Sequence, residues 1–153
     1  MISWFSKPLK VGAIAPPFLL PDEEGTVFVL NLHRNKYVVL IFYPGDDTPV
    51  CTKQMCEVRD NWEELRARGV YVVGINPQAA ESHGEFRKKL GLPFPLLVDN
   101  GKRVSRLYNA SGLMVRRTVY VIGKDGQILM GRRGKPSVQE ILAVIPEPQS
   151  AKA

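Results

Sequence analysis

The longest apolar run in the sequence is residues 37–43, YVVLIFY. A continuous run of β-branched and aromatic residues predicts a strand that is buried on both faces of a sheet. Residues 70–75 have the same character. Between the two runs, apolar residues recur at helical spacing, namely Cys51, Met55, Val58, Trp62 and Leu65. The pattern predicts a β-α-β unit with parallel strands and a helix over about residues 51 to 68, ended by Gly69.

The rest of the chain continues the alternation of strands and helices. Residues 24–32 predict a short strand before the first buried run, and 118–122 with 128–132 predict a hairpin joined through Asp125-Gly126. Further elements are expected at 81–90 (helix), 96–98 (strand), 102–108 (helix) and from the Ser137/Glu140 capping box to about 145 (helix). This order predicts an α/β, thioredoxin-like fold, in which helices flank a central mixed β-sheet with a short N-terminal strand extension.

The length of 153 residues is that of a single domain over 1–153, with an ordered core at about 8–146 and a loose tail over 147–153. No apolar run reaches the roughly 18 residues that a membrane span needs. No secretory apolar region is recognisable after Lys7, so we expect a cytoplasmic protein. The Trp4-Phe5 pair is either a frayed end or an anchor for packing or an interface, and the chain is expected to be a monomer or weak homodimer.

The net charge of +6 is unevenly spread, because residues 101–135 hold nine Lys and Arg residues against one acidic residue. These basic residues occur singly or in pairs, with few aromatic residues among them. A nucleic-acid footprint is usually a denser basic patch or stripe. We therefore expect a solvated basic face and no nucleic-acid partner.

Two cysteines cannot build a disulfide framework, so any special thiol chemistry belongs to Cys51 and Cys56. The two histidines, His33 and His83, have no cluster of further ligands at metal-binding spacing, so no metal is expected. Both histidines are interpreted as surface or capping residues. No organic cofactor is implied either.

Cys51 is expected where a loop becomes a helix, and unpaired N–H groups at a helix start stabilise a thiolate. Thr48 in the preceding loop can donate a hydrogen bond to the thiolate or to a bound oxygen, and Pro44 can close the pocket. The alternative is that Cys51 is a small core residue in the stripe that includes Met55 and Val58.

The segment from Pro44 to Cys51, PGDDTPVC, resembles the P-x-x-x-T-x-x-C active-site motif of the peroxiredoxins. The spacing from Cys51 to Cys56 resembles the cysteine pair of the peroxiredoxin Q or bacterioferritin comigratory protein group. The resemblance extends from about Val11 to Ile145 and includes Ser82-His83 and Arg117-Thr118.

This resemblance implies that Cys51 attacks a peroxide and becomes a sulfenic acid, and that Cys56 then condenses with it to a disulfide. Thioredoxin or a glutaredoxin-like reductant would recycle the enzyme. The resemblance assigns the donors to the Cys51 N–H, Thr48 and Arg117. Composition alone makes Arg116 an equal candidate, but side chains alternate along a strand, and we expect Arg117 to be the one that faces the sulfur.

The sequence departs from the family pattern at Gln54, where glutamate is common, and at Asn76-Pro77, which replaces a serine-rich stretch. Three alternatives stay open. A thiol-disulfide oxidoreductase would share the fold but normally uses C-x-x-C, whereas four residues separate these cysteines. A one-cysteine peroxidase would use an external thiol, and a basic binding module would have only structural cysteines.

Overall fold

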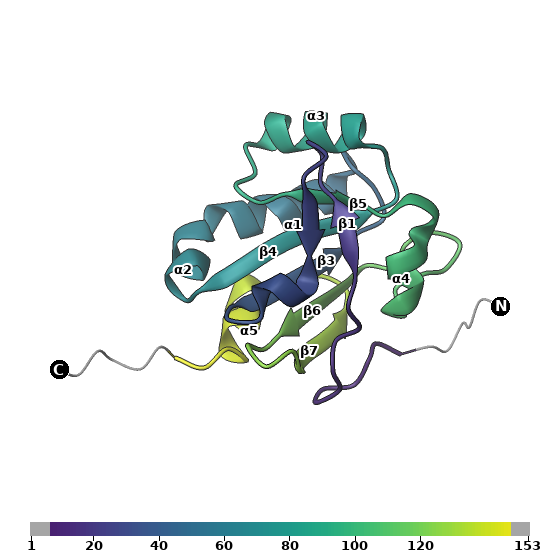
Figure 1. Cartoon of the computed structure of the whole chain (residues 1–153). Coiled ribbons are helices and arrows are strands. Elements are labelled where there is room, and N and C mark those ends of the chain that lie inside the picture. Colours follow the sequence, from purple (N-terminus) through teal and green to yellow (C-terminus); the bar gives the residue numbers. More distant parts are fainter. Residues whose placement is uncertain (1–6, 148–153) are drawn as a thin grey trace.

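A five-stranded mixed sheet forms the centre of the computed structural model, which describes residues 7–147 (Figure 1). The strand order is β5-β4-β3-β6-β7, with β3 paired parallel to β4 and antiparallel to β6. The strands are β3 (Tyr37–Phe42), β4 (Val70–Asn76), β5 (Leu96–Val98), β6 (Thr118–Ile122) and β7 (Ile128–Arg133). The expected thioredoxin-like arrangement is confirmed. Trp4 and Phe5, and the tail beyond residue 147, lie outside the described residues.

The helices are α1 (Pro49–Asp60), α2 (Trp62–Ala67), α3 (Ala80–Leu90), α4 (Arg103–Leu107) and α5 (Val138–Ala143), with 3-10 turns η1 (Leu30–His33) and η2 (Asn100–Lys102). The single helix expected over 51–68 is wrong, because Asn61 breaks it. Asn61 has non-helical angles (φ −109°, ψ 18°), and its side-chain amide donates to the Glu57 carbonyl at 2.8 Å. None of the helices within residues 7–147 is long and apolar enough to cross a membrane.

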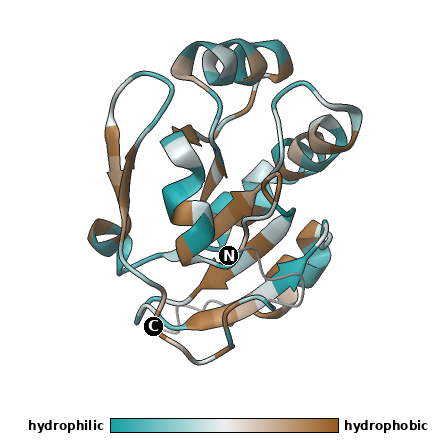
Figure 2. Ribbon diagram, turned by 90° about the vertical axis from the view of Figure 1, so that its right-hand side faces the viewer, coloured by the Kyte–Doolittle hydropathy of each residue, from teal (hydrophilic) through white to brown (hydrophobic). Residues whose placement is uncertain are grey.

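The alternation along β3 divides the core between the two faces of the sheet. Val39 and Ile41 pack with buried residues of α1, α2, α3 and α5, whereas Val38 and Leu40 pack on the opposite side with α4 and an N-terminal hairpin. Figure 2 shows apolar colouring along the central strands and hydrophilic colouring on much of the helices. Both faces of the sheet are therefore covered, as the continuous apolar runs predict.

The N-terminal hairpin consists of β1 (Leu19–Pro21) and β2 (Val27–Val29), which pair antiparallel. The strand expected over 24–32 is thus shorter than predicted, because the chain turns into η1 at Leu30. β1 has no counterpart in the sequence prediction, since three residues ending in proline give little strand signal.

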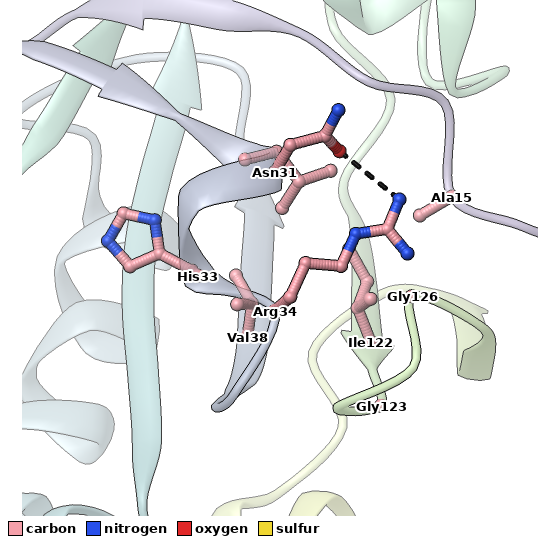
Figure 3. Close-up of a pocket in the computed structure, with 9 residues that line it drawn as sticks. Ala15, Asn31, His33, Arg34, Val38, Ile122, Gly123 and Gly126 are labelled. Atoms are coloured by element: carbon pink, nitrogen blue, oxygen red, sulfur yellow. Dashed lines mark hydrogen bonds between the residues drawn. The ribbon is translucent and has the colours of Figure 1, made fainter.

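A small depression lies beside η1 and the turn between β6 and β7 (Figure 3). The Arg34 guanidinium bridges these elements, donating to the Asp125 carbonyl at 3.0 Å and to the Asn31 side chain at 3.4 Å. The depression has room for about one water molecule. The depression is too small for a substrate, and the Arg34 side chain beside it serves to join η1 to the β6–β7 turn.

Candidate active site

Cys51 lies in the first turn of α1 and is fully buried. The helix begins at Pro49, where the missing N–H of proline would have had no helical partner. The Cys51 side chain belongs to the same core cluster as Met55 and Val58. Cys51 therefore combines the two alternatives from the sequence, since it fills the core and also sits among the unpaired N–H groups of a helix start.

The guanidinium of Arg117 contacts the Cys51 sulfur directly. Arg117 immediately precedes β6, and its Nη2 donates to Cys51 Sγ at 3.2 Å while its Nη1 donates to Gln54 Oε1 at 2.8 Å. The aliphatic part of Arg116 instead lies along Gly112. Because Gln54 is neutral, it fixes the guanidinium without cancelling its charge, so the positive charge acts on the sulfur.

The loop before α1 holds Pro44 and Thr48. Pro44 is half-buried, two residues beyond the end of β3, and Thr48 is the last residue before α1. The Thr48 hydroxyl donates to the Gly45 carbonyl at 3.3 Å rather than to Cys51. The structure thus brings Cys51, Gln54 and Arg117 into contact and places Pro44 and Thr48 in the adjoining loop.

Cys56 lies in the same helix, five residues after Cys51, and is partly exposed. Both thiols are free. The next turn carries Arg59, whose Nη1 donates to the Leu90 carbonyl at 2.7 Å and so ties α1 to the end of α3. The two sulfurs therefore differ sharply in access to solvent, with one in the core and the other near the surface.

His83 is not a surface or capping residue, and that prediction is wrong. Its side chain is completely buried on α3, three residues before the buried Phe86, on the face that packs against the sheet. Nδ1 lies 2.7 Å from Asp46 Oδ2, and Nε2 lies 2.8 Å from the Leu97 carbonyl oxygen. The helical spacing to Phe86 is the sequence signal that could have identified this burial. His33 is partly buried, and its Nδ1 lies 3.0 Å from the Val29 carbonyl at the start of η1.

Asp46 is the centre of a buried polar cluster that the sequence did not reveal. Besides facing His83, its carboxylate accepts hydrogen bonds from Tyr43 Oη (2.6 Å), Ser82 Oγ (2.7 Å) and Asn76 Nδ2 (3.2 Å). Burial alone would raise the pKa of Asp46, but the hydrogen bonds from His83, Tyr43 and Ser82 outweigh it and lower the pKa below the usual value. Burial and the Asp46 charge together raise the pKa of Tyr43 well above its usual value.

Within residues 7–147, no group of three or more His, Cys, Asp or Glu side chains is arranged to hold a metal ion.

A model of the AhpC/TSA family matches residues 11–130, which is most of the chain. The chain belongs to the AhpC/TSA family. This AhpC/TSA protein is 42% identical over 130 residues to "Peroxiredoxin Q, chloroplastic" of Sedum lineare, covering 82% of this chain and 69% of the plant protein. It is 40% identical over 121 residues to the protein of the same name from Oryza sativa subsp. japonica, covering 76% of this chain. It spans only 56% of the rice protein's length.

Among solved structures, peroxidoxin BcpB from Mycobacterium tuberculosis is similar to this AhpC/TSA protein, with a TM-score of 0.84 and 29% sequence identity. The match covers 95% of this chain and 99% of that protein. These relatives confirm the resemblance to peroxiredoxin Q and bacterioferritin comigratory protein, and identify an enzyme of the peroxiredoxin type.

Proposed function

We propose that this AhpC/TSA protein is a thiol-dependent peroxidase that reduces hydrogen peroxide and small organic hydroperoxides at Cys51. The observation that carries the proposal is the contact between Arg117 Nη2 and Cys51 Sγ in the first turn of α1. A cationic donor and a helix N-terminus both favour the thiolate, which is the nucleophilic form of cysteine.

In the first step, the Cys51 thiolate attacks the terminal oxygen of the peroxide. The O–O bond breaks, the sulfur is oxidised to a sulfenic acid, and the other oxygen leaves as water or alcohol after taking up a proton. Negative charge develops on the leaving oxygen, so fixed donors lower the barrier. Arg117 and the Cys51 N–H are suited to this role, and Thr48 joins them if its hydroxyl turns away from Gly45.

In the second step, the Cys56 thiolate attacks the sulfenic sulfur, an S–S bond forms and hydroxide leaves, to be protonated to water. A dithiol reductant such as thioredoxin or a glutaredoxin-like protein then reduces the disulfide and restores both thiols. Peroxide is thus the oxidant, and the external dithiol is the source of electrons.

The test is peroxide consumption coupled to thioredoxin, thioredoxin reductase and NADPH. Cys51→Ser should abolish turnover, whereas Cys56→Ser should still react once with peroxide at an unchanged rate but no longer be recycled by thioredoxin. Undiminished turnover by Cys51→Ser would refute the assignment. Disulfide reductase activity without peroxide consumption would instead identify a thiol-disulfide oxidoreductase.

A one-cysteine mechanism is the second candidate, and the position of the cysteines favours it. Cys51 and Cys56 lie in one continuous helix, with Cys51 buried and Cys56 partly exposed. If Cys56→Ser turns over as fast as the wild type with a monothiol reductant, the external thiol resolves the sulfenic acid and Cys56 has no role in the cycle.

A further inference from the structure

The buried pair of Asp46 and His83 lies next to the cysteine site but takes no part in the chemistry derived above. Tyr43 connects the two places. Its ring belongs to the same core cluster as Cys51 and Met55, and its hydroxyl donates to Asp46. The side chains of Asp46 and His83 are 3% and 0% exposed, so solvent does not screen their interaction.

The hydrogen-bond partners indicate which protonation state suits this pair. Asp46 accepts hydrogen bonds from Tyr43, Asn76 and Ser82, and these three donors favour the ionised carboxylate. An ionised carboxylate can only accept, so His83 Nδ1 must carry a proton. The Leu97 carbonyl can also only accept, so Nε2 must carry one too. Both ring nitrogens of His83 therefore face acceptors, an arrangement that suits the imidazolium form.

The pair joins three parts of the fold. Asp46 is in the turn between β3 and α1, two residues before Thr48, whereas His83 is on α3 and the Leu97 carbonyl is on β5. The Asp46 N–H also donates to Gln78 Oε1 at 2.5 Å, which adds a second tie between this turn and the segment before α3. A turn held at these points presents the start of α1 in one fixed position.

We propose that Asp46 and His83 form a buried carboxylate–imidazolium pair that acts as a positioning device for the Cys51 site. It holds the turn from Pro44 to Thr48 against α3 and β5, and thereby sets where Thr48 and the first N–H groups of α1 lie relative to the sulfur. The effect on peroxide reduction rests on the proposed function, while the charge state of the pair does not. Both residues act through the turn and touch no reacting atom.

The structure supplies a matched comparison in the next residue of the same turn. Asp47 pairs with Lys89 of α3 at 2.7 Å, but these side chains are 65% and 63% exposed. Exposed pairs contribute little because solvent screens them. The two neighbouring aspartates therefore make a buried and an exposed version of the same link from this turn to α3.

The first measurement is the histidine side-chain nitrogen NMR spectrum of the reduced wild-type protein at pH 7, which needs no variant that could fail to fold. The chain has two histidines, so His33→Gln assigns the signals. We expect both ring nitrogens of His83 to be protonated, and this expectation does not depend on whether the protein reduces peroxide. A neutral His83 ring, with one unprotonated nitrogen, would overturn the proposal.

The second measurement compares Asp46→Asn with Asp47→Asn. Both changes keep the side-chain shape, and asparagine tolerates the left-handed backbone of Asp47 (φ 61°). Asp46→Asn should turn His83 into a neutral ring, because the amide can donate to Nδ1. It should also lower the rate constant of Cys51 with hydrogen peroxide by about 10- to 100-fold, the size of effect that a displaced reacting group produces. Asp47→Asn should stay within about twofold of the wild type, as expected for a screened pair.

Alkylation of Cys51 by iodoacetamide in the Cys56→Ser background separates positioning from loosening of the fold. A purely structural role would change access to the buried thiol and so raise the alkylation rate of Asp46→Asn, with peroxide reactivity unchanged, which would overturn the proposal. A selective loss of peroxide reactivity supports it. If the wild type itself reduces no peroxide, the proposed function fails, and the NMR result alone decides the state of the pair.

Discussion

At the scale of single residues, the site has two parts, namely the Cys51 sulfur with its cationic donor Arg117 and the buried pair of Asp46 and His83 beside it. The resemblance to the peroxiredoxins assigned Arg117 to Cys51, since alternation along a strand shows only that one of two neighbouring arginines faces the sulfur, and Arg117 Nη2 does lie 3.2 Å from Cys51 Sγ. The burial of His83 could have been predicted from its helical spacing to Phe86, but its partner could not, because that carboxylate lies 37 residues away in the chain. The cluster around Asp46 forms only when the turn, α3 and β5 come together.

The paired arginines offer the most direct test of the residues around the sulfur. Arg117→Ala removes a cationic donor from Cys51 and should lower the rate constant with hydrogen peroxide by about 10²- to 10³-fold, as loss of one transition-state donor does. Arg116→Ala should change it by less than about threefold, since its side chain lies along Gly112. Stopped-flow fluorescence measures both rates. Equal losses in the two variants would show that the contact with Cys51 does not matter for the reaction.

Gln54 is a second residue whose effect can be predicted from its contact. Gln54→Met keeps the length of the buried side chain but removes the acceptor for Arg117 Nη1. Leaving a charged donor unpaired should cost about 1 to 3 kcal/mol of unfolding free energy and also slow the peroxide step. Urea denaturation and stopped-flow rates measure the two effects, with Lys53→Met as the exposed control on the same helix. A Gln54→Met protein as stable and as fast as that control would contradict the prediction.

At the scale of elements, most of the sheet follows from apolar runs, because strands buried on both faces need uninterrupted apolar sequence. The capping box also appears as predicted, with Ser137 and Glu140 each bonding to the other's backbone N–H. The break between α1 and α2 could not be predicted, because the apolar spacing continues through Asn61 and only the local backbone departs from it. Of the hairpin of β1 and β2, only the second strand was predicted. Each strand has three residues, which is too short to show an apolar period.

The geometry of helix α1 predicts that a disulfide between Cys51 and Cys56 cannot coexist with the intact helix. Five residues along an α-helix separate two Cα atoms by about 7.5 Å along the axis and about 140° around it, so more than about 8 Å in all. A disulfide needs Cα atoms within about 7 Å. Cys51 and Cys56 therefore cannot bond while α1 is intact, and the first turns must unwind in the oxidised protein.

Circular dichroism and amide hydrogen exchange on both redox forms test this prediction. The oxidised protein should show less helix and faster exchange across residues 51 to 60, and it should unfold at a lower temperature. Cys56→Ser treated with the same peroxide controls for oxidation without a disulfide. Equal helix content and equal exchange in the two forms would exclude Cys56 as the partner and favour an external thiol.

At the scale of the whole molecule, the two ends of the sheet have different roles. Cys51 follows β3 and Arg117 precedes β6, so the antiparallel pairing of β3 with β6 brings both to one end of the sheet. The same pairing brings Arg34, before β3, to Asp125, after β6, at the opposite end. The first contact serves the proposed chemistry, while the second only joins η1 to the β6–β7 turn. Stability can therefore be changed at one end without touching the site at the other.

Two glycines in the same left-handed conformation make this separation measurable. Gly126 and Gly25 have φ of 85° and 84°, so alanine costs each about 1 to 2 kcal/mol of backbone strain. A Cβ at Gly126 would lie 2.4 Å from Arg34 Nη1, whereas one at Gly25 meets nothing within 4 Å. Gly126→Ala should therefore destabilise the protein by about 0.5 to 1 kcal/mol more than Gly25→Ala, because the Arg34 side chain must leave the Asp125 carbonyl. Urea denaturation measures the difference in unfolding free energy, and in an Arg34→Ala background this difference should disappear.

The rate constant of Cys51 with peroxide should be unchanged in all of these variants, since Arg34 lies at the end of the sheet away from the sulfur. A slower peroxide reaction in Gly126→Ala would show that the two ends are coupled through β3 and β6.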